Sequence, residues 1–223
     1  DELIKSGHIP TVKLTVGHRQ TDIITTNVNR INQGLGAHTW SLRDGIFQYY
    51  PLEKPEDIQK KTIQEYERLV KRYGVKNVRC LTATKQKSLV STEALNPILR
   101  ELVNPTEGRE ALSFGSLDFY PNDRVMYTKE NNYAKDVFNG EMGTVLLTNP
   151  AQYTLEVIFD DGSREVFRGK DLKNLELCYA QTINKSMGSE CEAAIIAFVV
   201  PPILWSRNLL YTAVSVSYTH LRA

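Results

Sequence analysis

Hydrophobic positions follow two different periods along this chain, and the change of period divides it into three parts. Up to residue 103, short strand-like runs alternate with segments whose apolar residues recur at helical spacing. The predicted elements are strands at 12–16, 46–52 and 78–84 and helices at 22–31, 55–73 and 91–102. Because the last helix contains Pro97, we expect it to kink or to restart with Asn96 as its cap. Alternating strands and helices predict an α/β domain with a parallel sheet.

The middle part alternates apolar and polar residues with the period of two that is typical of strands. Residues 104–116 are rich in Pro, Gly, Glu and Ser and predict a linker. The predicted strands beyond it are 123–129, 143–148, 155–159 and 165–168, with tight turns at Asn139-Gly140 and Asp161-Gly162. Several short strands with strong turns predict a small β-barrel of about sixty residues.

The last part returns to the helix-and-strand pattern, so we interpret the barrel as an insertion into one α/β domain. Its predicted elements are strands at 172–180 and 193–200 and helices at 181–187 and 207–214, with Gly188 closing the first helix and Ser206 capping the second. The resulting segments are 1–116 and 173–214 for the α/β domain, 117–172 for the barrel, and 215–223 for a tail that we interpret as non-native.

Composition restricts the class of protein. The apolar content of 41% and charged content of 24% are ordinary for a globular protein, and the net charge of +1 gives no general attraction to nucleic acid. A nucleic-acid site must therefore be a local patch. The three cysteines form no C-x-x-C pair, which favours reduced structural thiols over metal ligands. The longest apolar run, 193–204, is too short to span a bilayer, so we expect a cytoplasmic protein without membrane contact.

Candidate phosphate-binding chemistry lies on the predicted helix 181–187. Thr182, Lys185 and Ser186 stand at i, i+3 and i+4, which places two hydroxyls and one ammonium on one helical face. Hydroxyls can donate to phosphate oxygens while lysine neutralises their charge. Thr82 and Lys85, where the predicted strand 78–84 ends, are further candidates because ligands bind beyond the carboxyl ends of parallel strands. An ordinary solvated surface is the alternative at both places.

Four stretches resemble the RecD-like group of superfamily 1 DNA helicases. They read I-P-x-V-x-L-T-x-x-x-R-Q at 9–20, F-x-x-x-D-R-V-M at 119–126 and Y-A-x-T-x-x-K-S-x-G-S-E at 179–190, and R-N-L-L-Y-T-A-V follows at 207–214. The resemblance implies an α/β, RecA-like parallel-sheet motor domain, the second of a helicase, with an inserted small β-barrel. It departs from the family where Asn184 and Met187 replace histidine and glutamine, and where Val216 replaces the arginine finger.

The resemblance also implies roles for individual residues. Arg19 would act as a catalytic residue at the ATP site, and the nucleotide-binding residues would be Arg19, Gln20, Gly188 and Glu190. Single-stranded DNA would contact Thr182, Asn184, Lys185 and Ser186, together with Thr82, Lys85, Asn131, Asn132 and Tyr133. Tyr133 offers a ring on which a base could stack, although turn chemistry is the alternative for the last three residues.

The function implied is that of an ATP-dependent DNA helicase that moves 5′ to 3′ on single-stranded DNA and unwinds duplex DNA in repair or recombination. ATP with Mg²⁺ would bind between this domain and an N-terminal RecA-like motor domain. The sequence contains no G-x-x-x-x-G-K-[ST] loop, so we expect this chain alone to be inactive. A non-enzymatic nucleic-acid-binding module is the alternative, whereas a nuclease would need a cluster of Asp, Glu and His that the sequence does not offer.

Overall fold

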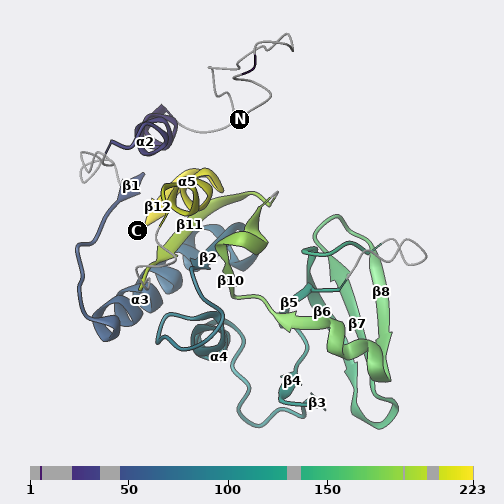
Figure 1. Cartoon of the computed structure of the whole chain (residues 1–223). Helices are drawn as coiled ribbons and strands as arrows, with labels where there is room; N and C mark the ends of the chain where they lie inside the picture. The colour runs from purple at the N-terminus through teal and green to yellow at the C-terminus, as the bar shows by residue number, and fades with distance from the viewer. Residues whose placement is uncertain are drawn as a thin grey trace.

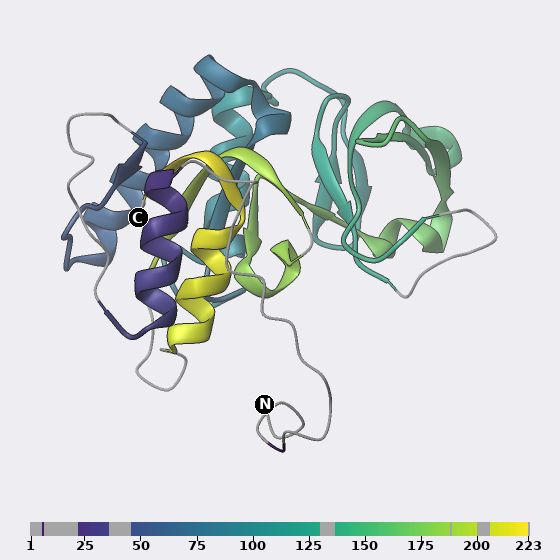
Figure 2. The ribbon, with the colours of Figure 1, turned by 90° about the horizontal axis from the view of Figure 1, so that it is seen from above.

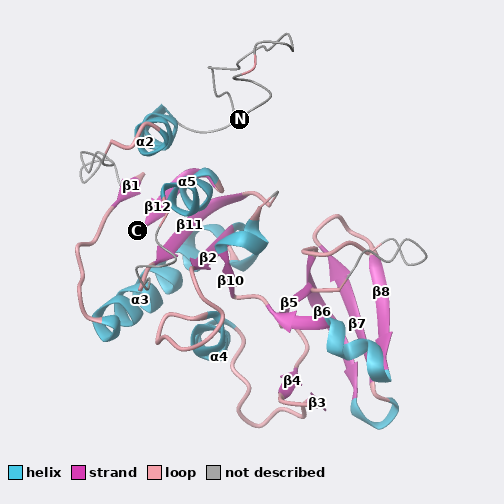
Figure 3. Cartoon of the chain, viewed as in Figure 1, coloured by secondary structure: helices cyan, strands magenta, loops and turns pink. Residues whose placement is uncertain are grey.

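The protein has two adjoining bodies, one built on a parallel sheet and one on an antiparallel sheet (Figure 1). The computed structural model describes residues 6, 22–35, 46–129, 137–187, 189–199 and 206–222. In these residues the α-helices surround the parallel sheet, while the other body consists of strands, loops and short 3-10 turns (Figure 3). The predicted strand at 12–16 lies outside the described residues.

The parallel sheet has the strand order β1-β12-β11-β2-β10, and every neighbouring pair runs parallel. Its strands are β1 (Phe47–Gln48), β2 (Val78–Thr82), β10 (Ala180–Thr182), β11 (Cys191–Ala197) and β12 (Ser217–Arg222). The apolar run without alternation predicted a strand buried on both faces, and β11 is that strand because six of its seven residues are buried. The predicted α/β class is confirmed.

Helices cover both faces of this sheet. On one face α2 (Asp22–Asn32) lies beside α5 (Arg207–Ser215) (Figure 2). On the other face pack α3 (Pro55–Tyr73) and α4 (Thr92–Val103). Side chains alternate along a strand, so neighbouring residues of β11 serve different cores: Ile196 packs in the cluster of α2 and α5, and Ile195 in that of α3 and α4.

The helix α4 does not restart at Pro97, which was one of the two outcomes that we expected; the other was a kink. The helix is continuous from Thr92 to Val103, and Ser91 caps it by accepting a hydrogen bond from the amide of Ala94. Asn96 is therefore not a cap. Its Oδ1 accepts hydrogen bonds from the amides of Tyr179 and Ala180 at 2.9 and 2.8 Å, which fastens α4 to the start of β10.

The antiparallel sheet has the order β8-β7-β6-β5-β9. Its strands are β5 (Arg124–Tyr127), β6 (Met142–Asn149), β7 (Thr154–Phe159), β8 (Arg164–Arg168) and β9 (Leu175–Leu177). Gly143 allows β6 and β7 to pair closely, because a Cβ there would lie 2.7 Å from the carbonyl oxygen of Ile158. In the described residues β8 and β9 lie at the two ends of this order and do not pair with each other. Closure into a barrel therefore stays a prediction.

The predicted linker contains a hairpin that the sequence pattern did not reveal. Strands β3 (Leu112–Phe114) and β4 (Leu117–Phe119) pair across Gly115, whose φ of 61° suits a tight turn. Leu112 and Phe119 are fully buried in the core of the antiparallel sheet. This segment therefore packs as part of the second body.

The antiparallel sheet lies along the chain between two neighbouring strands of the parallel sheet, β2 and β10. The single strand predicted at 172–180 is wrong in detail. A 3-10 helix (Gly169–Asn174) leads into β9, which pairs with β5, and only Ala180–Thr182 joins the parallel sheet. The reason is burial: Leu175 belongs to the core of the antiparallel sheet, whereas Ala180 belongs to that of α3 and α4.

A buried carboxylate joins the two bodies. Asp123 has no exposed surface and accepts hydrogen bonds from the hydroxyl of Tyr179 and the side-chain amide of Asn104, each at 2.8 Å. It also accepts from the amide of Tyr120 at 2.9 Å. Burial raises the pKa of Asp123 above its usual value, although these hydrogen bonds act to lower it. Asp123 therefore connects the end of α4, the start of the antiparallel sheet and the approach to β10.

Two other sequence predictions concern the cysteines and the C-terminal residues. Cys80, Cys178 and Cys191 are buried and unpaired, and burial raises the pKa of Cys80 to about 12, as expected for inert structural thiols. The segment that we interpreted as a tail forms β12, which lies between β11 and β1. None of the helices in the described ranges is long and apolar enough to cross a membrane.

Candidate nucleic-acid interface

Those predicted DNA-binding residues that the structure describes lie at the carboxyl edge of the parallel sheet. Thr82 and Thr182 end the adjacent strands β2 and β10 and are register partners. Thr82 is fully buried and its hydroxyl donates to the carbonyl of Thr84 at 2.9 Å, so this hydroxyl is not presented to a ligand. Thr182 is partly exposed, and it leads directly into the segment that carries Lys185.

The helix predicted at 181–187 is wrong in extent and type. Gln181 is a buried residue of β10, and the next element is the 3-10 helix η5 (Ile183–Ser186) of four residues. Its tighter winding takes Ser186, at i+4, off the predicted common face, whereas Thr182 and Lys185 at i and i+3 stay on one side. Ser186 is fully buried and donates to the carbonyl of Ile183 at 2.7 Å, so its predicted phosphate contact is not available in this conformation. Asn184 is exposed and Lys185 partly exposed.

Two predicted DNA-binding lysines converge on one glutamate. Lys85 Nζ lies 2.8 Å from Glu176 Oε1, and Lys185 Nζ lies 3.0 Å from Glu176 Oε2. Burial acts to raise the pKa of Glu176, but the hydrogen bonds from the two lysines outweigh it and hold the pKa below its usual value. The hydrogen bond to Glu176 likewise raises the pKa of Lys85. Glu176 and Lys85 are therefore charged at neutral pH.

This lysine pair, Lys85 and Lys185, together with Thr182 and Asn184, forms a local basic and polar surface on a nearly neutral chain. Side-chain exposures of 53% and 35% leave the two ammonium groups accessible to a phosphate. Sequence reasoning missed Glu176. It stands nine residues before Lys185, and no spacing rule links it to either lysine, because the contact depends on β9 joining the antiparallel sheet.

The predicted nucleotide-binding residue Glu190 lies elsewhere. It is exposed and immediately precedes β11, at the amino edge of the sheet, beside a cavity of about 250 Å³. The charged residues that line this cavity are Arg79, Glu141, Asp160, Asp161 and Glu190. Four carboxylates against one guanidinium repel a triphosphate, so this cavity does not fit the phosphates of ATP. Within the described ranges, no group of three or more His, Cys, Asp or Glu side chains is placed to hold a metal ion.

Several predicted site residues lie outside the described part of the chain. They are Arg19, Gln20, Asn131, Asn132, Tyr133 and Gly188. Their predicted roles in binding nucleotide or DNA stay predictions.

Comparisons with known proteins agree with the motifs. The family model described as the SH3 domain of ATP-dependent RecD-like DNA helicases matches residues 95–159. The ATP-dependent RecD2 DNA helicase of Deinococcus radiodurans is 36% identical over 132 residues. The chain is a relative of the RecD-like superfamily 1 helicases. The resemblance predicted from the sequence is thus confirmed, and the RecD-like family match includes the hairpin β3–β4 and strands β5 to β7.

Solved structures of helicases are similar in fold to this chain. A Bacteroides Pif1 described as bound to single-stranded DNA matches with a TM-score of 0.59 and 17% identity, covering 95% of this chain and 51% of that protein. A Bacteroides Pif1 in complex with ADP-AlF3 and single-stranded DNA matches with a TM-score of 0.57 and 18% identity. The chain thus spans about half the length of these proteins, and its match covers 18% of the Deinococcus relative.

Proposed function

We propose that this chain is the second motor domain of an ATP-dependent DNA helicase and that the carboxyl edge of its parallel sheet grips single-stranded DNA. The observation that carries the proposal is the convergence of Lys85, from the loop after β2, and Lys185, from η5, on the partly exposed carboxylate of Glu176. The named relatives support it, since they are described as DNA helicases and two of the similar structures as DNA-bound.

The surface explains how a chain with a net charge of +1 can bind a polyanion. Thr182 and Asn184 offer hydrogen bonds and the lysine pair offers charge, and such contacts to the phosphate backbone carry no sequence information. A translocating motor needs this kind of contact because it must hold every sequence. Release of the strand in each cycle is easier when few charges hold it.

We propose that ATP and Mg²⁺ act in the parent enzyme between this domain and an N-terminal RecA-like motor domain, with Arg19, Gln20, Gly188 and Glu190 on this side. The acidic cavity beside Glu190 supplies no phosphate contact, so phosphate binding falls to other residues. Movement from 5′ to 3′, a role in repair or recombination, the inactivity of this chain alone and a cytoplasmic location remain predictions.

The domain organisation is also a proposal. We propose that the antiparallel sheet is an insertion that begins near residue 117 and ends at residue 177, five residues later than the sequence pattern predicts, because β9 still pairs with β5. The hairpin β3–β4 packs with it. The α/β motor domain then resumes at β10, and the role of 215–223 as a non-native tail stays a prediction.

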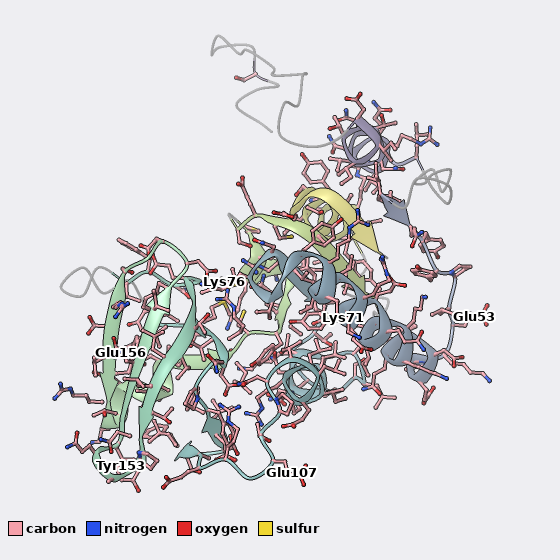
Figure 4. The ribbon with its side chains drawn as sticks, turned by 180° about the vertical axis from the view of Figure 1, so that it is seen from behind. Glu53, Lys71, Lys76, Glu107, Tyr153 and Glu156 are labelled. Carbon is pink, nitrogen blue, oxygen red and sulfur yellow. The ribbon has the colours of Figure 1, made fainter. Side chains whose placement is uncertain are left out.

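We expect Lys185→Ala to weaken binding of a fluorescent oligothymidine at low salt by about tenfold, because one phosphate contact is lost. Fluorescence anisotropy across a salt series measures this change. The matched control is Lys71→Ala, since Lys71 is an exposed lysine of α3 that is also paired with a glutamate, Glu67, at 2.7 Å (Figure 4). Equal affinities for wild type, K185A and K71A would contradict the proposal.

A further inference from the structure

We propose that the Glu176 carboxylate occupies the place of a DNA phosphate, so that it holds the lysine pair together in the free protein and weakens the grip on single-stranded DNA. This inference rests on the proposed function, because it assumes that the lysine pair binds the strand. Nothing in the motif itself assigns a role to Glu176, which precedes it by three residues.

The geometry is that of an anion shared by two cations. Glu176 presents one oxygen to Lys85 at 2.8 Å and the other to Lys185 at 3.0 Å. A phosphodiester likewise presents two unesterified oxygens and one negative charge. The three side chains come from three segments: the loop after β2, the strand β9 and the 3-10 helix η5. The antiparallel body thus supplies the anion, and the parallel body supplies both cations.

Exchange of the carboxylate for a phosphate is energetically accessible. The lysines are 53% and 35% exposed and Glu176 is 31% exposed, and ion pairs with such access to water are individually weak. Without Glu176 the pair would carry two positive charges with no anion between them. With Glu176, the three side chains together carry a net charge of one positive unit. A phosphate that binds the lysines must therefore compete with the carboxylate that already lies between them. Glu176 therefore lowers affinity and eases release.

The test is the substitution Glu176→Gln in the 223-residue chain, measured by anisotropy with the same oligothymidine. We expect E176Q to bind about fivefold more tightly at low salt, since both lysines become free for phosphate. The slope of log affinity against log salt should steepen by about 0.7 for each additional counterion displaced. Glu107→Gln is the matched control, because Glu107 is an exposed glutamate in the loop after α4 and the substitution changes the charge equally (Figure 4).

A second variant shows whether the effect passes through the lysines. In a K85A/K185A background, E176Q should give no tightening, because the cations that it releases are absent. Thermal unfolding followed by circular dichroism verifies that each variant is folded.

The outcomes separate this inference from the function on which it rests. If K185A weakens binding while E176Q leaves it unchanged or weakens it, the phosphate-substitute role is overturned and the DNA grip stands. If E107Q tightens binding as much as E176Q, the effect comes from the change in net charge and not from the position of Glu176. The inference is then also overturned. If neither K185A nor E176Q alters affinity, the proposed DNA grip itself fails.

Discussion

Replacing Asp123 with alanine is expected to lower the free energy of unfolding by about 3 to 5 kcal/mol, the largest loss that we predict for a single side chain. The carboxylate is fully buried and accepts hydrogen bonds from the Tyr179 hydroxyl, the Asn104 side chain and the Tyr120 amide. Alanine would remove the acceptor of the buried Tyr179 hydroxyl and of the Tyr120 amide, and each unsatisfied group costs about 1 to 3 kcal/mol. The Asn104 side chain would keep its hydrogen bond to the carbonyl of Pro121 at 3.1 Å. Urea unfolding followed by circular dichroism measures the loss.

The control for this experiment is Asp118→Ala in the hairpin β3–β4. Asp118 is exposed and accepts a hydrogen bond from the Ser113 hydroxyl at 2.5 Å, so its removal should cost less than about 1 kcal/mol. Because Asp123 touches segments of both bodies, D123A should also loosen the junction between them. A loss below about 1 kcal/mol for D123A would show that the junction does not depend on this carboxylate.

Glu65→Gln is expected to remove about 2 to 3 kcal/mol of stability at pH 7 and much less near pH 2. Burial acts to raise the pKa of Glu65, but hydrogen bonds from Lys61 and Arg68 outweigh it and lower the pKa to about 2 from 4.5. A carboxylate whose pKa is depressed on folding stabilises the protein above its unfolded value and loses that effect as pH falls. The wild-type advantage should therefore decline between about pH 5 and pH 2.

Glu67→Gln on the same helix is the control for the acid series. Glu67 pairs with Lys71 at 2.7 Å, but its side chain is 46% exposed, so the pair should contribute less than about 1 kcal/mol at any pH. Chemical unfolding at pH 7, 4 and 2.5 measures both variants. An E65Q difference that stays constant across this range would mean that the charge of Glu65 is not what stabilises the fold.

Much of the fold could be predicted because it depends on local pattern. Pro55 and Gly74 begin and end α3 as expected, since proline suits the first helical turn and Gly74 adopts a φ of 80°. The change from helical spacing to alternating apolar and polar residues predicted the antiparallel sheet, because this period is also a local pattern. The hairpin at 112–119 was missed because its turn sits in a stretch whose composition is typical of a linker.

The details of the candidate site depend on tertiary contacts that no local pattern encodes. Spacing placed Ser186 on an exposed face, but the burial of Gln181 and Ile183 shortens the helix to a 3-10 turn and turns Ser186 inward. Lys85 and Lys185 were both predicted, yet their meeting required Glu176 from the other sheet. The motif resemblance identified the two lysines, whereas the contact of both with Glu176 could be seen only in the fold.

The central claim is that the carboxyl edge of the parallel sheet binds single-stranded DNA, and hydrogen exchange with and without oligothymidine tests it most directly. We predict slower amide exchange in 83–88 and 183–187 when the oligonucleotide is bound, with no change in the middle of α3. Slower exchange confined to α3, or none at either edge segment under conditions where anisotropy shows binding, would contradict the claim.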